Sequence, residues 1–111
     1  MSRSKARGTA WETAIVRWLA AHGWPHAERR QLHGQHDRGD IAGIIGVVIE
    51  AKDCGAMKLA EWLTEAEVER GNDGATVGVV WHKRRGKASP GEAYVTMTGE
   101  TFAHLLRESG Y

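Results

Sequence analysis

The segment of residues 39–53, GDIAGIIGVVIEAKD, constrains this chain more than any other part of its sequence. Its middle is a run of apolar and β-branched residues, which is typical of a buried strand. Charged side chains nevertheless stand inside it: Asp40 near the start, and Glu50 and Lys52 near the end. A charge taken out of water costs free energy unless it is paired, hydrogen-bonded or bound to a metal. These three residues therefore predict a polar site built into the core of the fold.

Two glycines divide this segment into two strands. Gly43 and Gly46 favour a tight turn or bulge between strands at residues 40–45 and 47–52. If the two strands pair as an antiparallel hairpin, Asp40 returns to the far end of the second strand. The hairpin thus predicts that the charges at its two ends meet.

The second strand of this hairpin carries an alternating pattern. Glu50 and Lys52 are two residues apart, so they share one face, while Ala51 points the other way and offers its carbonyl oxygen nearby. With Asp40 beside them, two carboxylates and a carbonyl converge, and such hard oxygen ligands suit Mg²⁺. A lysine next to the ion can orient or deprotonate a metal-bound water, or neutralise a phosphate. A surface hairpin with a simple Glu–Lys pair is the alternative interpretation.

The remaining segments predict helices around these strands. Thr9 and Glu12 fit a capping box, so a helix is expected to start at about Thr9 and to end near Gly23. A second helix follows the hairpin and ends at residues 71–74, and Thr98 or Thr101 caps a short final helix. The expected strands are residues 26–33, 40–45, 47–52, 75–83 and 93–97.

The expected order of elements is therefore α-β-β-β-α-β-β-α. This order predicts an α/β fold, with a mixed central sheet of about five strands flanked by helices. Residues 1–7 are expected to form a flexible basic arm, and residues 8–111 a single domain, which suits a chain of 111 residues.

Composition limits the class of protein. Hydrophobic residues make up 41% of the chain and charged residues 26%, which indicates a folded protein with neither a membrane helix nor a signal peptide. The single cysteine, Cys54, excludes an internal disulfide framework and fits a reducing cytoplasm. The six histidines lack the close spacing of a Cys/His site, so no structural zinc is expected.

Charge is unevenly distributed along the chain. Residues 1–38 carry seven Lys/Arg and three acids, residues 39–73 three and eight, and residues 74–111 five and three. Two basic regions thus flank an acidic middle, which indicates a polyanionic partner such as DNA or, alternatively, only a solvated surface. The candidate DNA contacts are Arg3, Lys5, Arg7, Arg29, Arg30, Lys83, Arg84, Arg85 and Lys87.

The pattern Asp40, nine residues, Glu50-Ala51-Lys52 resembles the signature of the PD-(D/E)xK nuclease superfamily, with Gly39 in place of the Pro. Upstream, KARGTAWETAIVRWLAAHGW is similar to the start of archaeal-type and phage Holliday junction resolvases, with Glu12 as their helical glutamate. The likeness covers roughly residues 5–87. One departure is that the second helix carries four glutamates and no Gln, where many relatives carry a Gln that a Glu could replace here.

The resemblance implies a restriction-endonuclease-like core and a metal-dependent endonuclease of DNA recombination and repair. Asp40, Glu50 and the Ala51 carbonyl would bind Mg²⁺, with Mn²⁺ as a substitute. Glu12 would complete the metal shell, and Lys52 would help to activate the attacking water. The product would be a nicked strand with a 5′-phosphate. Relatives cleave four-way junctions symmetrically, which implies a homodimer. The resemblance also implies that the protein acts in the cytoplasm of a prokaryote or of a phage-infected host cell.

Several alternatives stay open on the sequence alone. Asp37 competes with Asp40 as the metal ligand. Asp40 is favoured because it starts the expected strand, whereas Asp37 lies in a polar loop. Glu12 could serve only its capping box. Trp62 and Trp81 are candidates for the dimer interface. The chain could also be another nuclease of this superfamily, of restriction or repair type, a DNA-binding module without catalysis, or a small protein-interaction domain.

Overall fold

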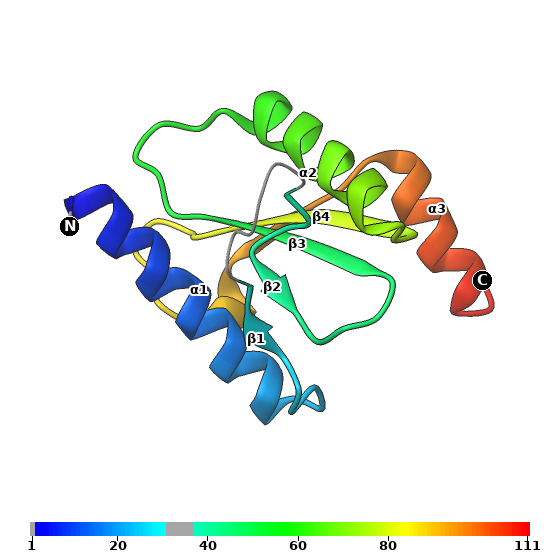
Figure 1. The fold of residues 1–111 in the computed structure, drawn as a ribbon, viewed down its shortest axis with the longest axis horizontal. Coiled ribbons are helices and arrows are strands. Elements are labelled where there is room, and N and C mark those ends of the chain that lie inside the picture. The colour runs from blue at the N-terminus through cyan, green and yellow to red at the C-terminus, as the bar shows by residue number, and fades with distance from the viewer. Residues whose placement is uncertain (1, 31–36) are drawn as a thin grey trace.

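A computed structural model describes residues 2–30 and 37–111 of the chain. Its elements follow the expected order, with one added turn of 3-10 helix (Figure 1). In chain order they are α1 (Arg3–Ala21), β1 (Glu28–Arg29), β2 (Ile41–Ala42), β3 (Val47–Lys52), α2 (Leu59–Asp73), β4 (Val77–His82), η1 (Pro90–Glu92), β5 (Tyr94–Thr96) and α3 (Gly99–Glu108).

The strands form one mixed sheet in the order β1-β2-β3-β4-β5. Strands β1, β2 and β3 pair antiparallel, β3 and β4 run parallel, and β5 returns antiparallel to β4. The parallel pair needs a crossover, and α2 supplies it. The expected α/β fold with a mixed sheet of five strands is confirmed.

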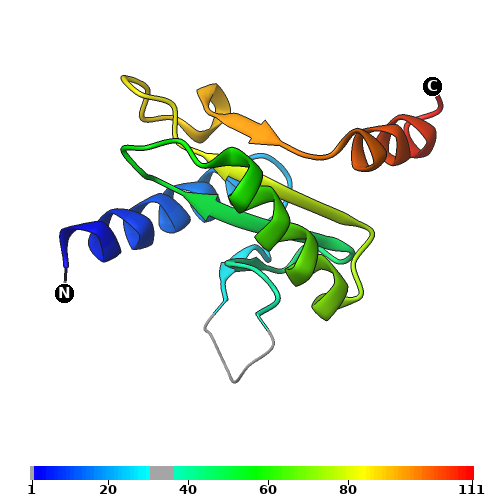
Figure 2. The same cartoon turned by 90° about the horizontal axis from the view of Figure 1, so that it is seen from above.

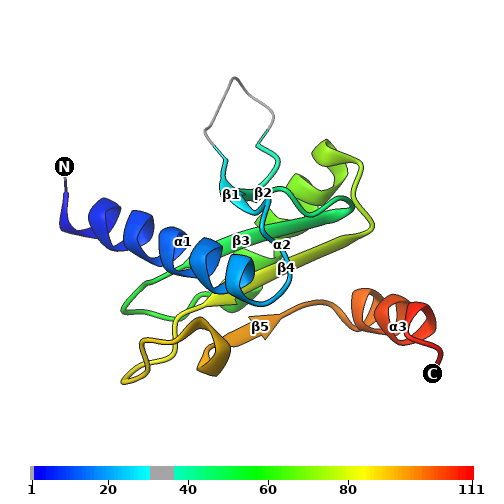
Figure 3. The same cartoon turned by 90° about the horizontal axis from the view of Figure 1, so that it is seen from below.

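Helices α1 and α2 cover opposite faces of the sheet, and β3 and β4 send alternate side chains to each of these two helices. Trp11, Ile15 and Leu19 of α1 pack with Ile49 and other odd-numbered strand residues in the larger core cluster. On the opposite face, α2 packs through a smaller cluster of Trp62, Ala66 and Val80. Figures 2 and 3 show α1 and α2 on opposite sides of β3 and β4, with α3 beyond the end of β5. Odd positions of β3 therefore face α1, and even positions face α2.

Helix α1 begins at Arg3, so the expected start at Thr9 is wrong. Ser2 is the N-cap, and its hydroxyl accepts a hydrogen bond from the Lys5 N–H at 3.1 Å. A serine followed by Arg, Lys and Ala favours helix continuation, which explains why the helix starts six residues before the capping box. The basic residues of the expected flexible arm therefore lie on the first turns of α1.

The hairpin forms as expected, with Ile41 opposite Ile49, but β2 is only two residues long. Gly43 explains why this strand ends early. Its φ of +97° is disfavoured for other residues, and a Cβ there would collide with the backbone of His26. The last three residues of the expected first strand, 31–33, lie outside the described residues.

The positions of two tryptophans and of the α3 cap bear on two further expectations. Trp62 and Trp81 are only 6% and 8% exposed, so they belong to the core, and their expected role in a dimer interface is wrong. Thr98, rather than Thr101, is the N-cap of α3, because its hydroxyl accepts from the Thr101 N–H at 3.1 Å. No helix of the described residues is long and apolar enough to cross a membrane.

Candidate metal centre

The centre is built around Glu50, which β3 directs toward α2. Glu50 follows Val48 at the two-residue period of the strand, so both side chains lie on the α2 face. Val48 is fully buried there, and Glu50 is only 6% exposed. The hydrophobic sequence around Glu50 thus forces its carboxylate into the core, as the sequence predicts.

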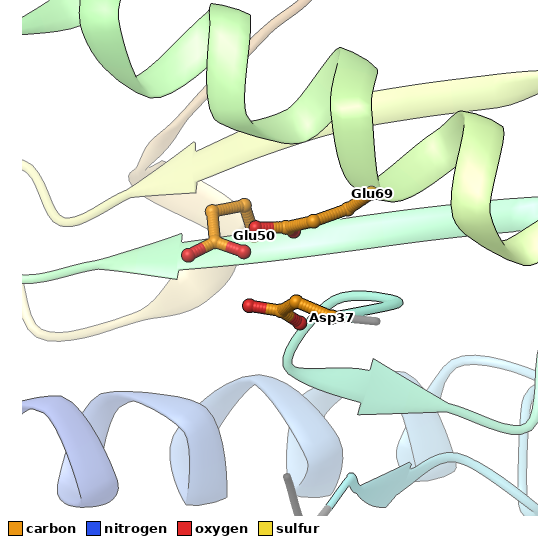
Figure 4. A group of neighbouring side chains, drawn as sticks. All are labelled: Asp37, Glu50 and Glu69. Carbon is orange, nitrogen blue, oxygen red and sulfur yellow. The ribbon is translucent and has the colours of Figure 1, made fainter. Parts of the chain in front are cut away.

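Two more carboxylates meet Glu50 in this place. Glu69 reaches it from α2, and Asp37 reaches it from the segment that leads into β2 (Figure 4). Oxygen atoms of the three side chains all lie within 4.8 Å of one another. Three elements that are distant in sequence therefore bring one cluster of hard oxygen ligands together, and such a cluster could hold a divalent cation.

The backbone around Asp37 is held against α2. The Asn72 side-chain amide donates to the Asp37 carbonyl at 2.9 Å, and the Asp37 carboxylate accepts from the Gly39 N–H at 2.9 Å. Next to this bond, Arg30 and Arg38 approach the Asp73 carboxylate at 3.4 and 3.5 Å. These contacts fix the segment in a position from which Asp37 faces Glu50.

Asp40 lies at the neighbouring position, as the hairpin predicts. Its Oδ2 accepts a hydrogen bond from the Ala51 N–H at 2.8 Å, and its own N–H donates to the Ile49 carbonyl at 2.9 Å. The N–H and C=O of one strand residue point to the same side, so the Ala51 carbonyl also faces the Asp40 side of β3. Asp40 is outside the closest three-carboxylate group, which contains Asp37 instead.

Lys52 shares the Glu50 face, and its ammonium lies between two carboxylates. The Lys52 Nζ is 3.5 Å from Glu50 Oε1 and 3.2 Å from Glu65 Oε2. Burial acts to lower the pKa of Lys52, but the charges of Glu50 and Glu65 outweigh burial and raise it. Lys52 therefore places a positive charge directly beside Glu50.

Crowding changes the acidity of the carboxyl groups. Burial raises the pKa of Glu50 to about 9, and the adjacent Glu69 adds to this rise. Burial and then the charge of Glu50 raise the pKa of Asp40 to about 8, although the Ala51 N–H bond opposes them. Burial likewise raises the pKa of Glu69 to about 7. Without a cation, Asp40, Glu50 and Glu69 thus resist ionisation together.

Two oxygen atoms of the cluster lack a partner. Glu50 Oε2 and Glu69 Oε2 are buried and accept no hydrogen bond from any described residue. A buried acceptor without a donor is costly, and a hard divalent cation is the ligand that such oxygens fit best. The residues present therefore fit the Mg²⁺ that the sequence pattern implies.

Glu12 stands apart from the three-carboxylate group. Its carboxylate pairs with the Arg29 Nε at 3.1 Å, at the side of α1 that faces β1. Its charge still contributes to the raised pKa of Asp40. Glu12 is thus near the edge of the centre, where its carboxylate already has a partner.

The nine basic residues predicted to contact DNA divide into two groups. Arg29 and Arg30 pair with the acids Glu12 and Asp73, and Arg29 remains exposed. The others lie on the first turns of α1 and in the loop after β4. Figure 1 shows the N-terminus of α1 at the same end of the molecule as the loops that follow β3 and β4. Arg3, Lys5, Arg7, Lys83, Arg84, Arg85 and Lys87 therefore gather at one end.

The loop after β4 keeps the charges of Arg84 and Arg85 accessible, while Lys87 pairs with Glu92 at 3.4 Å. Lys83 lies 3.9 Å from Asp53 and over the ring of Trp11, and the Arg84 guanidinium stacks over Tyr94. Arg84 and Arg85 are exposed. Aromatic contacts of this kind hold a cationic side chain in place without neutralising it.

Glu69 is the member of the centre that the sequence pattern does not single out. It is one of four glutamates in α2, and only the rotation of the helix against the sheet shows which of them face the site. Glu65 and Glu69 are four residues apart and so share one helix face. The sequence offers one signal for such a residue: the helix after Glu-x-Lys lacks the Gln of many relatives, and a glutamate could replace it.

Comparisons with family models, with curated proteins and with solved structures find no match to this chain.

Proposed function

We propose that this protein is a metal-dependent endonuclease that nicks DNA, of the Holliday junction resolvase type. The observation that carries the proposal is Glu50: a buried carboxylate with an unpartnered oxygen, with Asp40 on one side and Lys52 on the other. Acidic ligands with an adjacent lysine, at the end of two parallel strands, form a set suited to phosphodiester hydrolysis.

Asp40, Glu50 and the Ala51 carbonyl would hold Mg²⁺ or Mn²⁺, with Asp37 as the alternative carboxylate. When bound, such an ion lowers the pKa of its water and neutralises charge on the scissile phosphate. The Asp40 bond to the Ala51 N–H orients its carboxylate, so that one oxygen is fixed and the other is free to act as a ligand. Burial by α2 keeps bulk water away from Glu50.

Lys52 would act as a cation and hydrogen-bond donor. The carboxylates of Glu50 and Glu65 hold the proton on its ammonium while they are ionised. A charged lysine at this position can orient the attacking water or pair with a phosphate oxygen, which favours these roles over that of a general base.

The partner class follows from charge. Basic residues of α1 and of the loop after β4 lie at the end of the molecule to which β3 and β4 point (Figure 1). Phosphate contacts from these residues would place a nucleic-acid backbone near Lys52, and they would make binding salt-dependent. The four-way junction as preferred substrate, the two-fold dimer and the 5′-phosphate product come from the sequence resemblance.

The test uses a labelled synthetic four-way junction beside the matched duplex and single strand, with Mg²⁺ and with EDTA. We expect paired nicks in the junction that need Mg²⁺, and their loss in Glu50→Gln and Lys52→Ala. Glu61→Gln, an exposed glutamate on the same helix as Glu69, is the matched control and should cleave normally.

Other outcomes assign other functions. Cleavage of all three substrates would indicate a nuclease without junction selectivity. Binding without cleavage in either Mg²⁺ or Mn²⁺ would reject the endonuclease and leave a DNA-binding module. Normal cleavage by Glu50→Gln would reject this centre as the active site.

A further inference from the structure

The carboxylates of Asp37, Glu50 and Glu69 form a group that the Asp-x₉-Glu-x-Lys pattern does not contain. They come from three separate elements: the segment before β2, strand β3 and helix α2 (Figure 4). Only Glu50 is shared with the sequence pattern. The group therefore needs an explanation of its own.

Burial and missing partners supply a second observation. Glu50 and Glu69 are 6% and 4% exposed, and each leaves its Oε2 without a hydrogen-bond donor among the described residues. Figure 4 shows the two carboxylates directed toward each other and toward Asp37. Acidic groups that merely cover a surface would turn to water, whereas these are enclosed with their acceptors unsatisfied.

The scaffold around the group is already in place. Asn72, three residues after Glu69 on α2, holds the Asp37 carbonyl at 2.9 Å. The Gly39 N–H fixes one oxygen of the Asp37 carboxylate at 2.9 Å, so the other oxygen remains for a ligand bond. The helix that supplies Glu69 thus also positions Asp37, and no large rearrangement is needed to bring the oxygens to one ion.

The nature of the ligand follows from the donor set and from charge. All donors are carboxylate oxygens, which select Mg²⁺, Mn²⁺ or Ca²⁺ over softer metals. The three carboxyl groups lie together, and only Glu50 among them pairs with the Lys52 ammonium. A divalent cation removes the repulsion that this excess creates.

We propose that Asp37, Glu50 and Glu69 form a divalent-cation site, with Glu69 as a direct ligand from α2. The site shares Glu50 with the proposed nuclease centre and so deepens that function. The cation also joins α2 to the sheet, because its ligands come from both.

The experiment counts bound Mn²⁺ by electron paramagnetic resonance and measures its affinity by calorimetry on the full chain, without DNA. We expect Glu69→Gln and Asp37→Asn each to reduce the affinity for one Mn²⁺ ion at least about tenfold. Glu61→Gln, exposed on the same helix, should bind Mn²⁺ as the wild type does. Wild-type number and affinity of Mn²⁺ in Glu69→Gln would overturn the proposal.

Thermal unfolding in EDTA tests whether Glu69→Gln loses Mn²⁺ binding only because it is misfolded. Glu69→Gln removes one like charge from a crowded cluster, so the metal-free variant should unfold no earlier than the wild type. Added Mn²⁺ should then raise the melting temperature of Glu61→Gln more than that of Glu69→Gln, because a ligand that binds only the folded state stabilises it. Equal shifts in both variants would count against the site.

The binding measurement separates this proposal from the proposed nuclease. A protein that binds Mn²⁺ through Glu69 but cuts no DNA supports the cation site and rejects the endonuclease. A protein that cuts DNA while Glu69→Gln keeps every Mn²⁺ supports the endonuclease and rejects the cation site.

Discussion

At the scale of single residues, the centre is a place where the fold opposes the ionisation of its own side chains. Asp40, Glu50 and Glu69 have raised pKa values because burial and mutual repulsion disfavour their charged forms. Bound protons relieve this repulsion at low pH, and a divalent cation would relieve it while the carboxylates are ionised.

The first prediction concerns pH. These three carboxyl groups have ordinary pKa values of 3.8 to 4.5, and in the folded protein their pKa values are about 7 to 9. Between these limits the folded protein holds protons that the unfolded chain releases, so the free energy of unfolding falls as pH rises. In EDTA, the melting temperature should therefore fall from pH 5.5 to pH 9, measured by calorimetry.

Two controls belong to this pH series. Adding Mg²⁺ at pH 9 should restore much of the lost stability, because the bound ion favours the ionised carboxylates. Glu50→Gln removes the group with the highest of these pKa values and should make the metal-free profile flatter. A metal-free melting temperature that rises over this interval would contradict the raised pKa values.

At the scale of elements, the hairpin decides whether Asp40 reaches Glu50. The turn depends on Gly43, whose φ of +97° and contact with the His26 backbone leave no space for a side chain. Strand β2 is only two residues long, so the turn and the Asp40 bonds, more than the ladder itself, hold the register.

A glycine pair tests the role of this turn. Gly43→Ala should lower the free energy of unfolding by more than about 2 kcal/mol, since it adds backbone strain and a steric clash. Gly8→Ala, inside α1 with open space around its Cα, should instead raise it by up to about 1 kcal/mol. Urea unfolding of both variants measures the difference, and a Gly43→Ala protein as stable as the wild type would contradict the close approach.

In the whole molecule, most of the candidate DNA-contacting residues gather at one end. The first turns of α1 and the loop after β4 carry seven of the candidate DNA contacts at one end, while α3 lies at the other (Figures 1 and 3). Such a distribution orients a polyanion before any specific contact forms, because the attraction acts over roughly a Debye length of about 8 Å.

Salt dependence provides the measurement at this scale. The double variant Arg84→Ala, Arg85→Ala should weaken DNA binding and reduce the slope of log K against log salt by about 2, one unit for each lost phosphate contact. Arg107→Ala on α3 removes one positive charge at the far end and should leave the slope near the wild-type value. Similar losses in the two variants would show that the basic end does not direct binding.

The sequence by itself determined the order of elements, the bounds of β3, the hairpin and the shared face of Glu50 and Lys52. These features are local: alternation sets the strand faces, and glycine marks the turn. The start of α1 was missed because two capping signals stand seven residues apart, and the bonded pair of Ser2 and Lys5 forms the earlier one.

Packing between elements determines which acids gather at the centre. Asp37 and Glu69 stand 32 residues apart in the chain, and no periodic pattern connects them. Their meeting depends on how α2 rotates against β3, which is set by the packing of Trp62 and Ala66, and on the Asn72 bond to the Asp37 carbonyl. The strand places Glu50 by its own periodicity, whereas the choice among four helical glutamates requires the packed core, because helix orientation is a property of the contacts between elements.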